Sequence, residues 1–416
     1  AMLPTTMDEY TLALTGFVLG VALTFSILHL FQRSKHSPNS FPRKHKVPAW
    51  HPPQIVQGLA GCIGNTPLIY LKTLSEATGC TILGKAEFLN PGGSSKDRIA
   101  REIVLNALKS GALPPGGTIV EGTSGSTGIS LSLIAAATGC QCDITMPDDQ
   151  AVEKSNLMTL FGANVERVRP AAISNDRHYS RIAESRSRNT DSGTGHGSST
   201  FYTDQFENLD NVKAHRTTTG VEIWTQTGGN IDAFVMSAGT GGTLTGVGSY
   251  LKEQNEQVQV VLADPSGSVL YHRVKDGVAY APQQSEKTLK RVRIDTITEG
   301  IGIDRLTRNF TEYEDCVDDA LRITDQEAVN MAWHLLRNEG LFLGSSSGLN
   351  CTAAMKVARR LGPGHTVVTV LCDSGNRHLT KLYNLDFLER NELVVDIDMA
   401  LVAEEEGEEE EEDEMD

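Results

Sequence analysis

The chain has 416 residues, enough for one large or two medium domains. Hydrophobic residues make up 39% and charged residues 22%, as in soluble globular proteins. The net charge of −16 is uneven, because residues 404–416 carry 11 acidic side chains and no basic one, which leaves −5 for the rest. This charge distribution excludes the basic footprint of a nucleic-acid-binding protein. We therefore expect no nucleic-acid partner.

The seven cysteines are odd in number and contain no Cys-x-x-Cys pair. This usage is typical of a reducing compartment and predicts no structural disulfide. Cys140 and Cys142 lie in an apolar run, where buried thiols are the expected interpretation. We predict no metal site.

The first predicted element is a transmembrane helix over Tyr10–Phe31, which follows a short segment, residues 1–9, and contains no Asp, Glu, Lys or Arg. Its 22 residues are enough to span a bilayer. Basic residues follow in the Pro-rich linker 32–54, so the positive-inside rule places the rest of the chain in the cytosol. An outer mitochondrial membrane anchor fits this pattern better than the endoplasmic reticulum, and a buried core helix is the alternative.

Residues 55–398 form the predicted catalytic region, in which β-branched apolar runs alternate with helical patterns. Such alternation predicts an α/β fold with a parallel sheet wrapped by helices. The predicted strands are Thr81–Phe88, Thr118–Glu121, Gln141–Met146, Asn164–Val168, Ile231–Ser237, Gln257–Ala263 and Thr366–Cys372. A polar stretch over Asn189–Thr200 is a predicted mobile insertion, and residues 399–416 are a predicted disordered acidic tail.

A glycine-rich loop, Gly239–Thr243, follows the apolar run Phe234–Ala238 and precedes the helical pattern Leu244–Leu251. Strand, glycine turn and helix together make a geometry in which backbone N–H groups hold a phosphate. The spacing matches neither a Walker loop nor a dinucleotide fingerprint. By itself the loop predicts either a phosphate site or a tight turn without a ligand.

Lys96 lies at the start of the helical pattern Ile99–Leu108. The positive end of a helix dipole disfavours a charged amine and lowers its pKa, which helps an amine to form a Schiff base. The alternative is a solvated surface lysine beside a capping serine.

Two further loops, Thr123–Gly128 and Gly344–Gly348, are rich in small hydroxyl residues and also precede helical patterns. Free N–H groups and hydroxyls at a helix start suit a carboxylate, although each loop taken singly is also an ordinary capped turn. Loops of this kind gather at the carboxyl edge of a parallel sheet, where ligands bind.

Nine short motifs in chain order give the sequence a specific resemblance. They are Ile63–Leu68 (IGNTPL), Ser95–Arg98 (SKDR), Thr123–Gly128 (TSGSTG), Met146–Pro147, Gln205–Phe206, Thr219–Trp224 (TGVEIW), Gly239–Thr243 (GTGGT), Glu299–Gly302 (EGIG) and Asp373–Gly375 (DSG). Together they resemble the cysteine synthase / cystathionine β-synthase family of fold-type II pyridoxal-phosphate enzymes, and most of all a fungal-type membrane-anchored cysteine synthase.

The resemblance implies two doubly wound sheet domains, preceded here by the transmembrane helix. A smaller subdomain of about residues 97–206 is expected inside a larger one made of 55–96 and 207–398. It also implies a homodimer, pyridoxal 5′-phosphate as cofactor, and an amino acid with sulfide or a thiol as substrates.

The resemblance also assigns roles to single residues. Lys96 matches the lysine that forms the Schiff base, and Ser346 matches the serine facing the pyridine nitrogen. Ser126 takes the place of an asparagine that contacts the cofactor's 3′ oxygen. The predicted phosphate loop is Gly239, Thr240, Gly241, Gly242 and Thr243. The predicted substrate-carboxylate residues are Thr123, Ser124, Thr127 and Gln205.

Ser126 is the main departure from the family pattern, because a serine is shorter than an asparagine and offers one hydroxyl instead of an amide. The expected reaction is O-acetyl-L-serine plus sulfide giving L-cysteine and acetate. Two alternatives stay open: condensation of serine with homocysteine, and a catalytically weak protein that acts as a membrane-tethered scaffold.

Overall fold

The structure is a computed structural model that describes residues 55–171, 173–189, 199–281 and 296–402. Residues Val56–Asp416 form one unit, distinct from Ala1–Ile55. The predicted transmembrane helix Tyr10–Phe31 lies outside the described residues, as do the linker and most of the acidic tail and of the insertion. Within the described part of the chain, no helix is both long and apolar enough to cross a membrane.

The larger sheet has six strands in the order β1-β2-β10-β7-β8-β9. Its neighbouring strands run parallel, except that β1 pairs with β2 in the antiparallel direction at one edge. Its strands are β1 (Leu68–Tyr70), β2 (Thr81–Ala86), β7 (Ala233–Ser237), β8 (Gln259–Pro265), β9 (Asp319–Ile323) and β10 (Thr366–Leu371).

Both faces of this sheet are covered, as alternate side chains along β7 show. Ala233 and Val235 join one apolar core with residues of α14, while Phe234 and Met236 join a second core with residues of α9. Successive strand residues point to opposite faces, so a buried strand supplies two cores at once. The helices of the first core are α2 (Lys72–Thr78), α13 (Asp325–Glu339) and α14 (Ser345–Leu361), and those of the second are α8 (Gly220–Thr227), α9 (Gly242–Gln254) and α10 (Leu270–Asp276).

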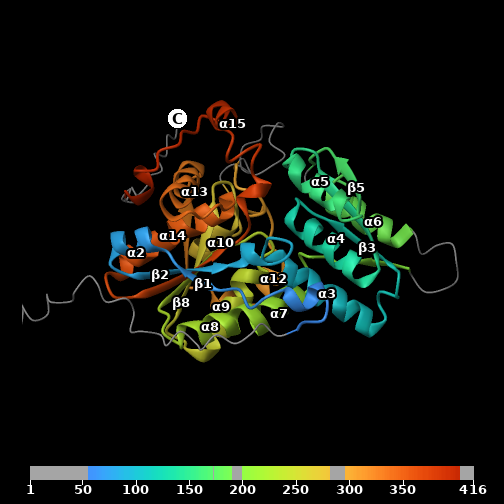
Figure 1. Cartoon of the computed structure of the whole chain (residues 1–416), viewed down its shortest axis with the longest axis horizontal. Helices are drawn as coiled ribbons and strands as arrows, with labels where there is room; N and C mark the ends of the chain where they lie inside the picture. The colour runs from blue at the N-terminus through green and yellow to red at the C-terminus, as the bar shows by residue number, and fades with distance from the viewer. Residues whose placement is uncertain (1–54, 172, 190–198, 282–295, 403–416) are drawn as a thin grey trace, which may run out of the picture. The chain divides into compact units, whose positions relative to one another are not determined.

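The smaller sheet has four parallel strands in the order β5-β4-β3-β6. Its strands are β3 (Thr118–Gly122), β4 (Gln141–Pro147), β5 (Asn164–Val168) and β6 (Thr200–Tyr202). Its helices are α3 (Lys96–Ser110), α4 (Ser126–Thr138), α5 (Val152–Leu160) and α6 (Tyr179–Asn189). Figure 1 shows them gathered in the teal and green part, beside the helices of the larger sheet.

Shorter elements connect the two sheets and complete the fold. They are α7 (Asp210–Ala214), a π-helical turn (His215–Thr219), α12 (Arg308–Thr311), α15 (Leu385–Arg390) and 3₁₀ turns at Leu59–Cys62, Glu87–Leu89, Glu314–Cys316, Gly375–Arg377 and Met399–Leu401.

The predicted strands are present, but several limits differ. Strand β2 ends at Ala86 and not at Phe88, because Glu87–Leu89 turn into a 3₁₀ helix. The helix predicted from Ile99 begins at Lys96. Three strands were not predicted: β1 and β6, each of three residues, and β9, whose sequence DALRI carries two charges. Short or charged runs give too few apolar residues for the period-2 signal.

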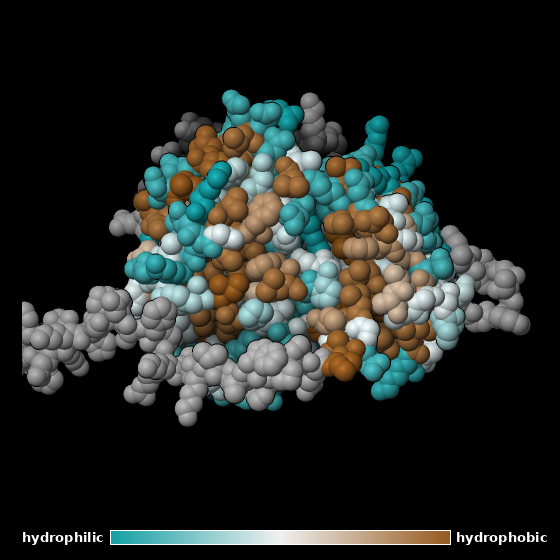
Figure 2. All heavy atoms as spheres, in the orientation of Figure 1, coloured by the Kyte–Doolittle hydropathy of each residue, from teal (hydrophilic) through white to brown (hydrophobic). Residues whose placement is uncertain are grey.

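All seven cysteines are free thiols in the structure, and six of them are buried. Apolar side chains are also visible on the surface in Figure 2, as brown spheres among the teal ones. Exposed examples include Leu160, Leu385 and Val394. Exposed apolar atoms are usual in folded proteins, so these side chains do not by themselves locate a partner surface.

Candidate functional site

Two adjoining pockets lie where the loops of both sheets meet. Lys96 and Ser126 line both of them, as do Gly239 and Thr240. The inner pocket is further lined by Gly241, Thr243 and Ser346, and the outer one, of about 190 Å³, by Thr123, Ser124, Thr127 and Gln205. The structure thus brings the predicted site residues together, with the exception of Gly242, which lines neither pocket.

Lys96 is the first residue of α3 and is half-buried at the junction of the two pockets. Burial lowers its pKa, while the nearby Cys372 and Asp373 act in the opposite direction. The cause expected from the sequence was the helix dipole, but the cost of burying the ammonium is the largest contribution. A lysine with a lowered pKa holds more of its amine in the neutral, nucleophilic form.

The loop Gly239–Thr243 connects β7 to α9, as predicted. A Cβ on Gly239 would lie 2.3 Å from the carbonyl oxygen of Gly300, and Gly241 has a φ of +85°. A Cβ on Gly242 would collide with the Asn211 side chain, so this glycine serves packing and not the pocket wall. Close packing therefore requires the glycines whether or not a ligand is bound.

Side chains of α7 and of the π-helical turn hydrogen-bond to the two threonine hydroxyls of this loop. Asn211 Nδ2 donates to Thr240 Oγ1 at 2.9 Å, and Thr243 Oγ1 lies 3.1 Å from His215 Nε2. Burial lowers the pKa of His215 well below its usual value, so its ring is neutral. The N–H of Gly242, the first residue of α9, donates to Thr240 Oγ1 at 3.4 Å. The next N–H groups of α9 lack intrahelical partners and are available to an anion.

These donors fit pyridoxal phosphate. The start of α9, with the Thr240 and Thr243 hydroxyls, offers donors for a phosphate at one end of the inner pocket. Ser346, in the first turn of α14, supplies a neutral hydroxyl, and Lys96 supplies an amine for the aldehyde. Ser237, which also lines this pocket, has a buried hydroxyl without a hydrogen-bond partner in the described chain.

Two of the four predicted carboxylate-binding residues, Thr127 and Gln205, form a hydrogen-bonded pair. Thr127 Oγ1 donates to Gln205 Oε1 at 2.6 Å, and Gln205 Nε2 donates to the carbonyl oxygen of Gly122 at 3.0 Å. Gln205 thus fixes the loop in this structure, and its amide is committed to protein atoms. The first N–H groups of α4, beside Ser124 and Ser126, are the donors best placed for a carboxylate.

Glu121 lies behind this pair, at the end of β3, and is fully buried. Its carboxylate accepts from Thr203 Oγ1, from the backbone N–H groups of Gly122 and Gln205, and from Gln205 Nε2. No cation pairs with it within the described residues, and burial raises its pKa to about 7. Glu121 therefore holds Gln205, one of the residues predicted to bind the substrate carboxylate, in place.

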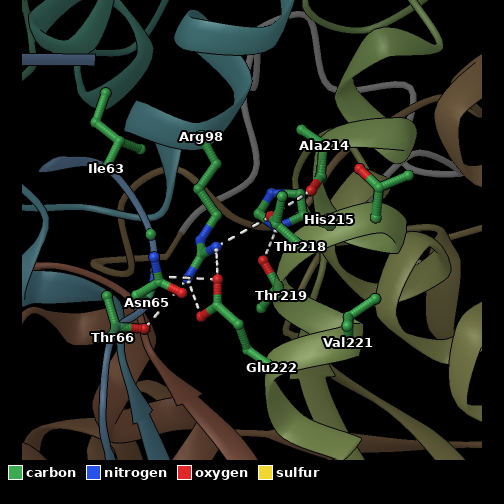
Figure 3. A network of polar contacts seen from close by, with 12 residues as sticks. Ile63, Asn65, Thr66, Arg98, Ala214, His215, Thr218, Thr219, Val221 and Glu222 are labelled. Atoms are coloured by element: carbon green, nitrogen blue, oxygen red, sulfur yellow. Dashed lines mark hydrogen bonds and ion pairs between the residues drawn. The ribbon is translucent and has the colours of Figure 1, made fainter. Parts of the chain in front are cut away.

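Arg98, two residues after Lys96, is the centre of a buried ion network (Figure 3). Its Nη1 lies 2.6 Å from Glu222 Oε1, and its Nη2 lies 2.7 Å from Glu87 Oε1. Lys85 Nζ also reaches Glu222, at 2.6 Å. Asn65, with a positive φ of 50°, donates its backbone N–H to Glu222. Parts of the motifs around Asn65, Arg98 and Glu222 thus lock together behind the lysine instead of lining the pockets.

Ser126 contacts a second buried arginine. Arg377 Nη1 donates to Ser126 Oγ at 3.1 Å, and its Nη2 donates to the carbonyl oxygen of Gly92. Arg377 was not singled out from the sequence, although it lies two residues beyond the Asp373–Gly375 motif.

Sequence reasoning also missed a buried charge cluster beside the pockets. Lys154 Nζ lies 2.5 Å from Glu299 Oε2, and Lys381 Nζ lies 2.8 Å from Glu299 Oε1. Asp373, which lines the inner pocket, lies 3.0 Å from His378 Nε2 through its Oδ2. The motifs containing Glu299 and Asp373 were the available signal, but they indicated no role.

Comparison with known proteins gives consistent matches. The family model described as "Pyridoxal-phosphate dependent enzyme" matches residues 59–373. "Cysteine synthase 2" of Schizosaccharomyces pombe is 43% identical over 394 residues, covering 93% of this chain and 96% of its own. "Cysteine synthase 2" of Neurospora crassa is 51% identical over 333 residues, covering 79% of this chain and 73% of its own. A "Putative mitochondrial cysteine synthase" of Saccharomyces cerevisiae is 45% identical, covering 80% and 85%.

Solved structures show the same fold. O-ureido-L-serine synthase matches with a TM-score of 0.68 and 29% identity, covering 79% of this chain and 96% of its own. The O-acetylserine dependent cystathionine beta-synthase from Helicobacter pylori matches with a TM-score of 0.67 and 30% identity, covering 79% and 99%.

Proposed function

Since this chain belongs to the pyridoxal-phosphate-dependent enzymes and, within them, to the cysteine synthases, we propose that it converts O-acetyl-L-serine and sulfide into L-cysteine and acetate. The observation that carries the proposal is the position of Lys96 at the junction of an inner pocket that fits the cofactor and an outer pocket lined by the carboxylate loop.

The residues divide the work as follows. The start of α9 with Thr240 and Thr243 anchors the phosphate, and the start of α4 orients the substrate carboxylate. Bound pyridoxal phosphate supplies the electron sink for chemistry at the Cα atom of the amino acid. Lys96 Nζ, with its pKa lowered by burial, accepts the α-proton and later returns one to the product. Ser346 is a neutral partner for the pyridine nitrogen of the cofactor. A neutral partner leaves the cofactor a weaker electron acceptor than an acidic partner would.

Product analysis of the purified full-length protein tests this function. We expect L-cysteine from O-acetyl-L-serine with sulfide, at a rate well above that of cystathionine from L-serine with homocysteine. The opposite ranking would assign the chain to the cystathionine-forming reaction, and no turnover with either pair would favour a scaffold.

Lys96→Ala is the matched test of the lysine. We expect it to abolish turnover and borohydride-dependent fixation of the cofactor, because no other amine lines the inner pocket within the described chain. Unfolding in urea should remain close to wild type, since Lys96 makes no ion pair within the described residues. A variant that still fixes cofactor on a lysine would contradict the assignment.

We also propose that Tyr10–Phe31 anchors the protein in the outer mitochondrial membrane with the catalytic region in the cytosol, and that the enzyme is a homodimer. The uncharged run with its basic flank supports the anchor, and the yeast relative is named mitochondrial. Alkaline carbonate should leave the protein in the membrane, and protease added to intact mitochondria should digest it. A monomer in sedimentation analysis would contradict the dimer.

A further inference from the structure

Arg377 is a buried cation close to the pockets, and it has no anionic partner among the residues that the structure describes. It ends the 3₁₀ turn Gly375–Arg377 and is 3% exposed. Within the described residues, no carboxylate lies within ion-pair distance of its guanidinium, which donates only to the neutral oxygens of Ser126 and Gly92. Burial lowers the pKa of Arg377, and Asp373 and Asp97 offset only part of that effect.

The contact with Arg377 decides how the Ser126 hydroxyl is used. A guanidinium only donates hydrogen bonds, so Ser126 Oγ is the acceptor and keeps its own hydrogen for another partner. No atom of the described chain accepts that hydrogen. Ser126 lies at the junction of the two pockets together with Lys96. The hydroxyl hydrogen is therefore available to a ligand at the point where the cofactor meets the substrate.

We propose that Arg377 is a positioning residue, which orients and polarises the Ser126 hydroxyl so that it donates a hydrogen bond to the anionic ring oxygen of pyridoxal phosphate. The inference rests on the cofactor binding stated above. It deepens the proposed function by explaining how a serine serves where the family pattern has asparagine.

The physical reason is charge assistance. A serine offers one short donor in place of an amide, and a positive charge directly behind that donor strengthens its bond to an anion. The oxygen in turn supplies the negative partner that the guanidinium lacks in the described chain. Removing either Arg377 or the Ser126 hydroxyl should therefore weaken the same hydrogen bond to the ring oxygen.

Two readouts without substrate test the inference on the full-length enzyme loaded with cofactor. One is the position of the cofactor's visible absorption band between pH 6 and pH 9, and the other is its rate of release. For Ser126→Ala and for Arg377→Met, we expect a shifted band and release faster by about tenfold, the loss typical of one charge-assisted hydrogen bond. The double variant should match Ser126→Ala, because Arg377 acts through that hydroxyl.

Two further variants separate positioning from simple structural support. Arg377→Lys keeps the charge and should recover part of the wild-type band position. Arg101→Met removes another arginine that donates to a backbone carbonyl, that of Ile63, and should leave the band unchanged.

Three results would overturn the inference. Additive effects in the double variant would mean that Arg377 acts through Gly92 and the loop before Lys96. An unchanged band in Ser126→Ala would mean that the hydroxyl does not contact the cofactor. A wild-type protein that shows no visible band with added pyridoxal phosphate would overturn cofactor binding, and with it the proposed function.

Discussion

Arg98 and Arg377 are two buried arginines close to the loop that carries Lys96, and their surroundings differ. Arg98 pairs with Glu87 and Glu222, which raise its pKa above the usual value although burial acts to lower it. In the described part of the chain, the Arg377 guanidinium donates only to a hydroxyl and a carbonyl oxygen, and burial lowers its pKa. One guanidinium has two carboxylate partners, and the other has none within the described residues.

The difference separates structural from functional charge. A buried ion pair whose hydrogen bonds are all made holds elements together, and breaking it leaves an uncompensated charge. A buried charge without a counterion is costly to the empty protein and is found where a ligand completes it. Carboxylates show the same division. The pKa of Glu222, between two cations, is lowered to about 2, whereas that of Glu121, among neutral donors, is raised to about 7.

The largest expected effect on stability comes from removing Arg98, the arginine with two carboxylate partners. Arg98→Met should lower the free energy of unfolding by about 3–5 kcal/mol, because Glu87 and Glu222 lose their common partner. Urea unfolding of the full-length protein measures it. Arg101→Met, on the same helix, loses a single bond to a carbonyl oxygen and should cost about 1 kcal/mol. Equal losses in the two variants would mean that the ion pairs of Arg98 add no more to the free energy of unfolding than the single hydrogen bond of Arg101.

A smaller loss is expected for Glu222→Gln, at about 1–3 kcal/mol, because the amide still accepts hydrogen bonds but no longer balances Arg98 and Lys85. The effect should depend on pH. The pKa of Glu222 is depressed to about 2, so its contribution is present above about pH 4.5 and is lost as the pH falls toward 2. Unfolding at pH 7 and at pH 3 should therefore show a smaller gap between variant and wild type at pH 3. A constant gap would contradict the role of its charge.

These contrasts also show what the sequence could predict. The loops at Lys96, Gly239–Thr243 and Gly344–Gly348 were predicted correctly as strand-to-helix connections or helix starts, because glycine and hydroxyl residues follow apolar runs there. The partners of Arg98 could not be predicted, since Glu222 is 124 positions away and its motif, Thr219–Trp224, did not indicate which residue it contacts. Arg377 contacts Ser126 across 251 positions, so this hydrogen bond could not be predicted from the sequence either.

One part of the sequence interpretation was wrong, and other parts stay predictions. The helix dipole was the expected cause of the lowered pKa of Lys96, whereas burial is the main one, and burial depends on packing that only the folded chain reveals. The limits of the smaller subdomain at about residues 97–206 and the roles given to single site residues stay predictions. The membrane anchor lies outside the described residues.

The carboxylate without a counterion gives the next prediction. Glu121 has its pKa raised to about 7, so it stabilises the fold fully below about pH 4.5, and that contribution is lost as the pH rises through 7. Glu121→Gln should remove this slope, and the free energy of unfolding should differ less between pH 5 and pH 8 than in wild type. The nearby Asp204 titrates in both proteins, so the difference between the two slopes isolates Glu121. Identical slopes would mean that Glu121 is already compensated.

A change in stability as small as that of Arg101→Met is expected for Arg377→Met without cofactor. The variant loses hydrogen bonds to Ser126 and Gly92, but it also removes a buried charge that has no anionic partner in the described chain, and these effects oppose each other. We expect a loss of about 1 kcal/mol, well below that of Arg98→Met, measured by urea unfolding of the cofactor-free protein. Added cofactor should stabilise wild type more than the variant, because ligand stabilisation grows with affinity. A loss as large as that of Arg98→Met would place Arg377 among the structural charges and remove the contrast between the two arginines.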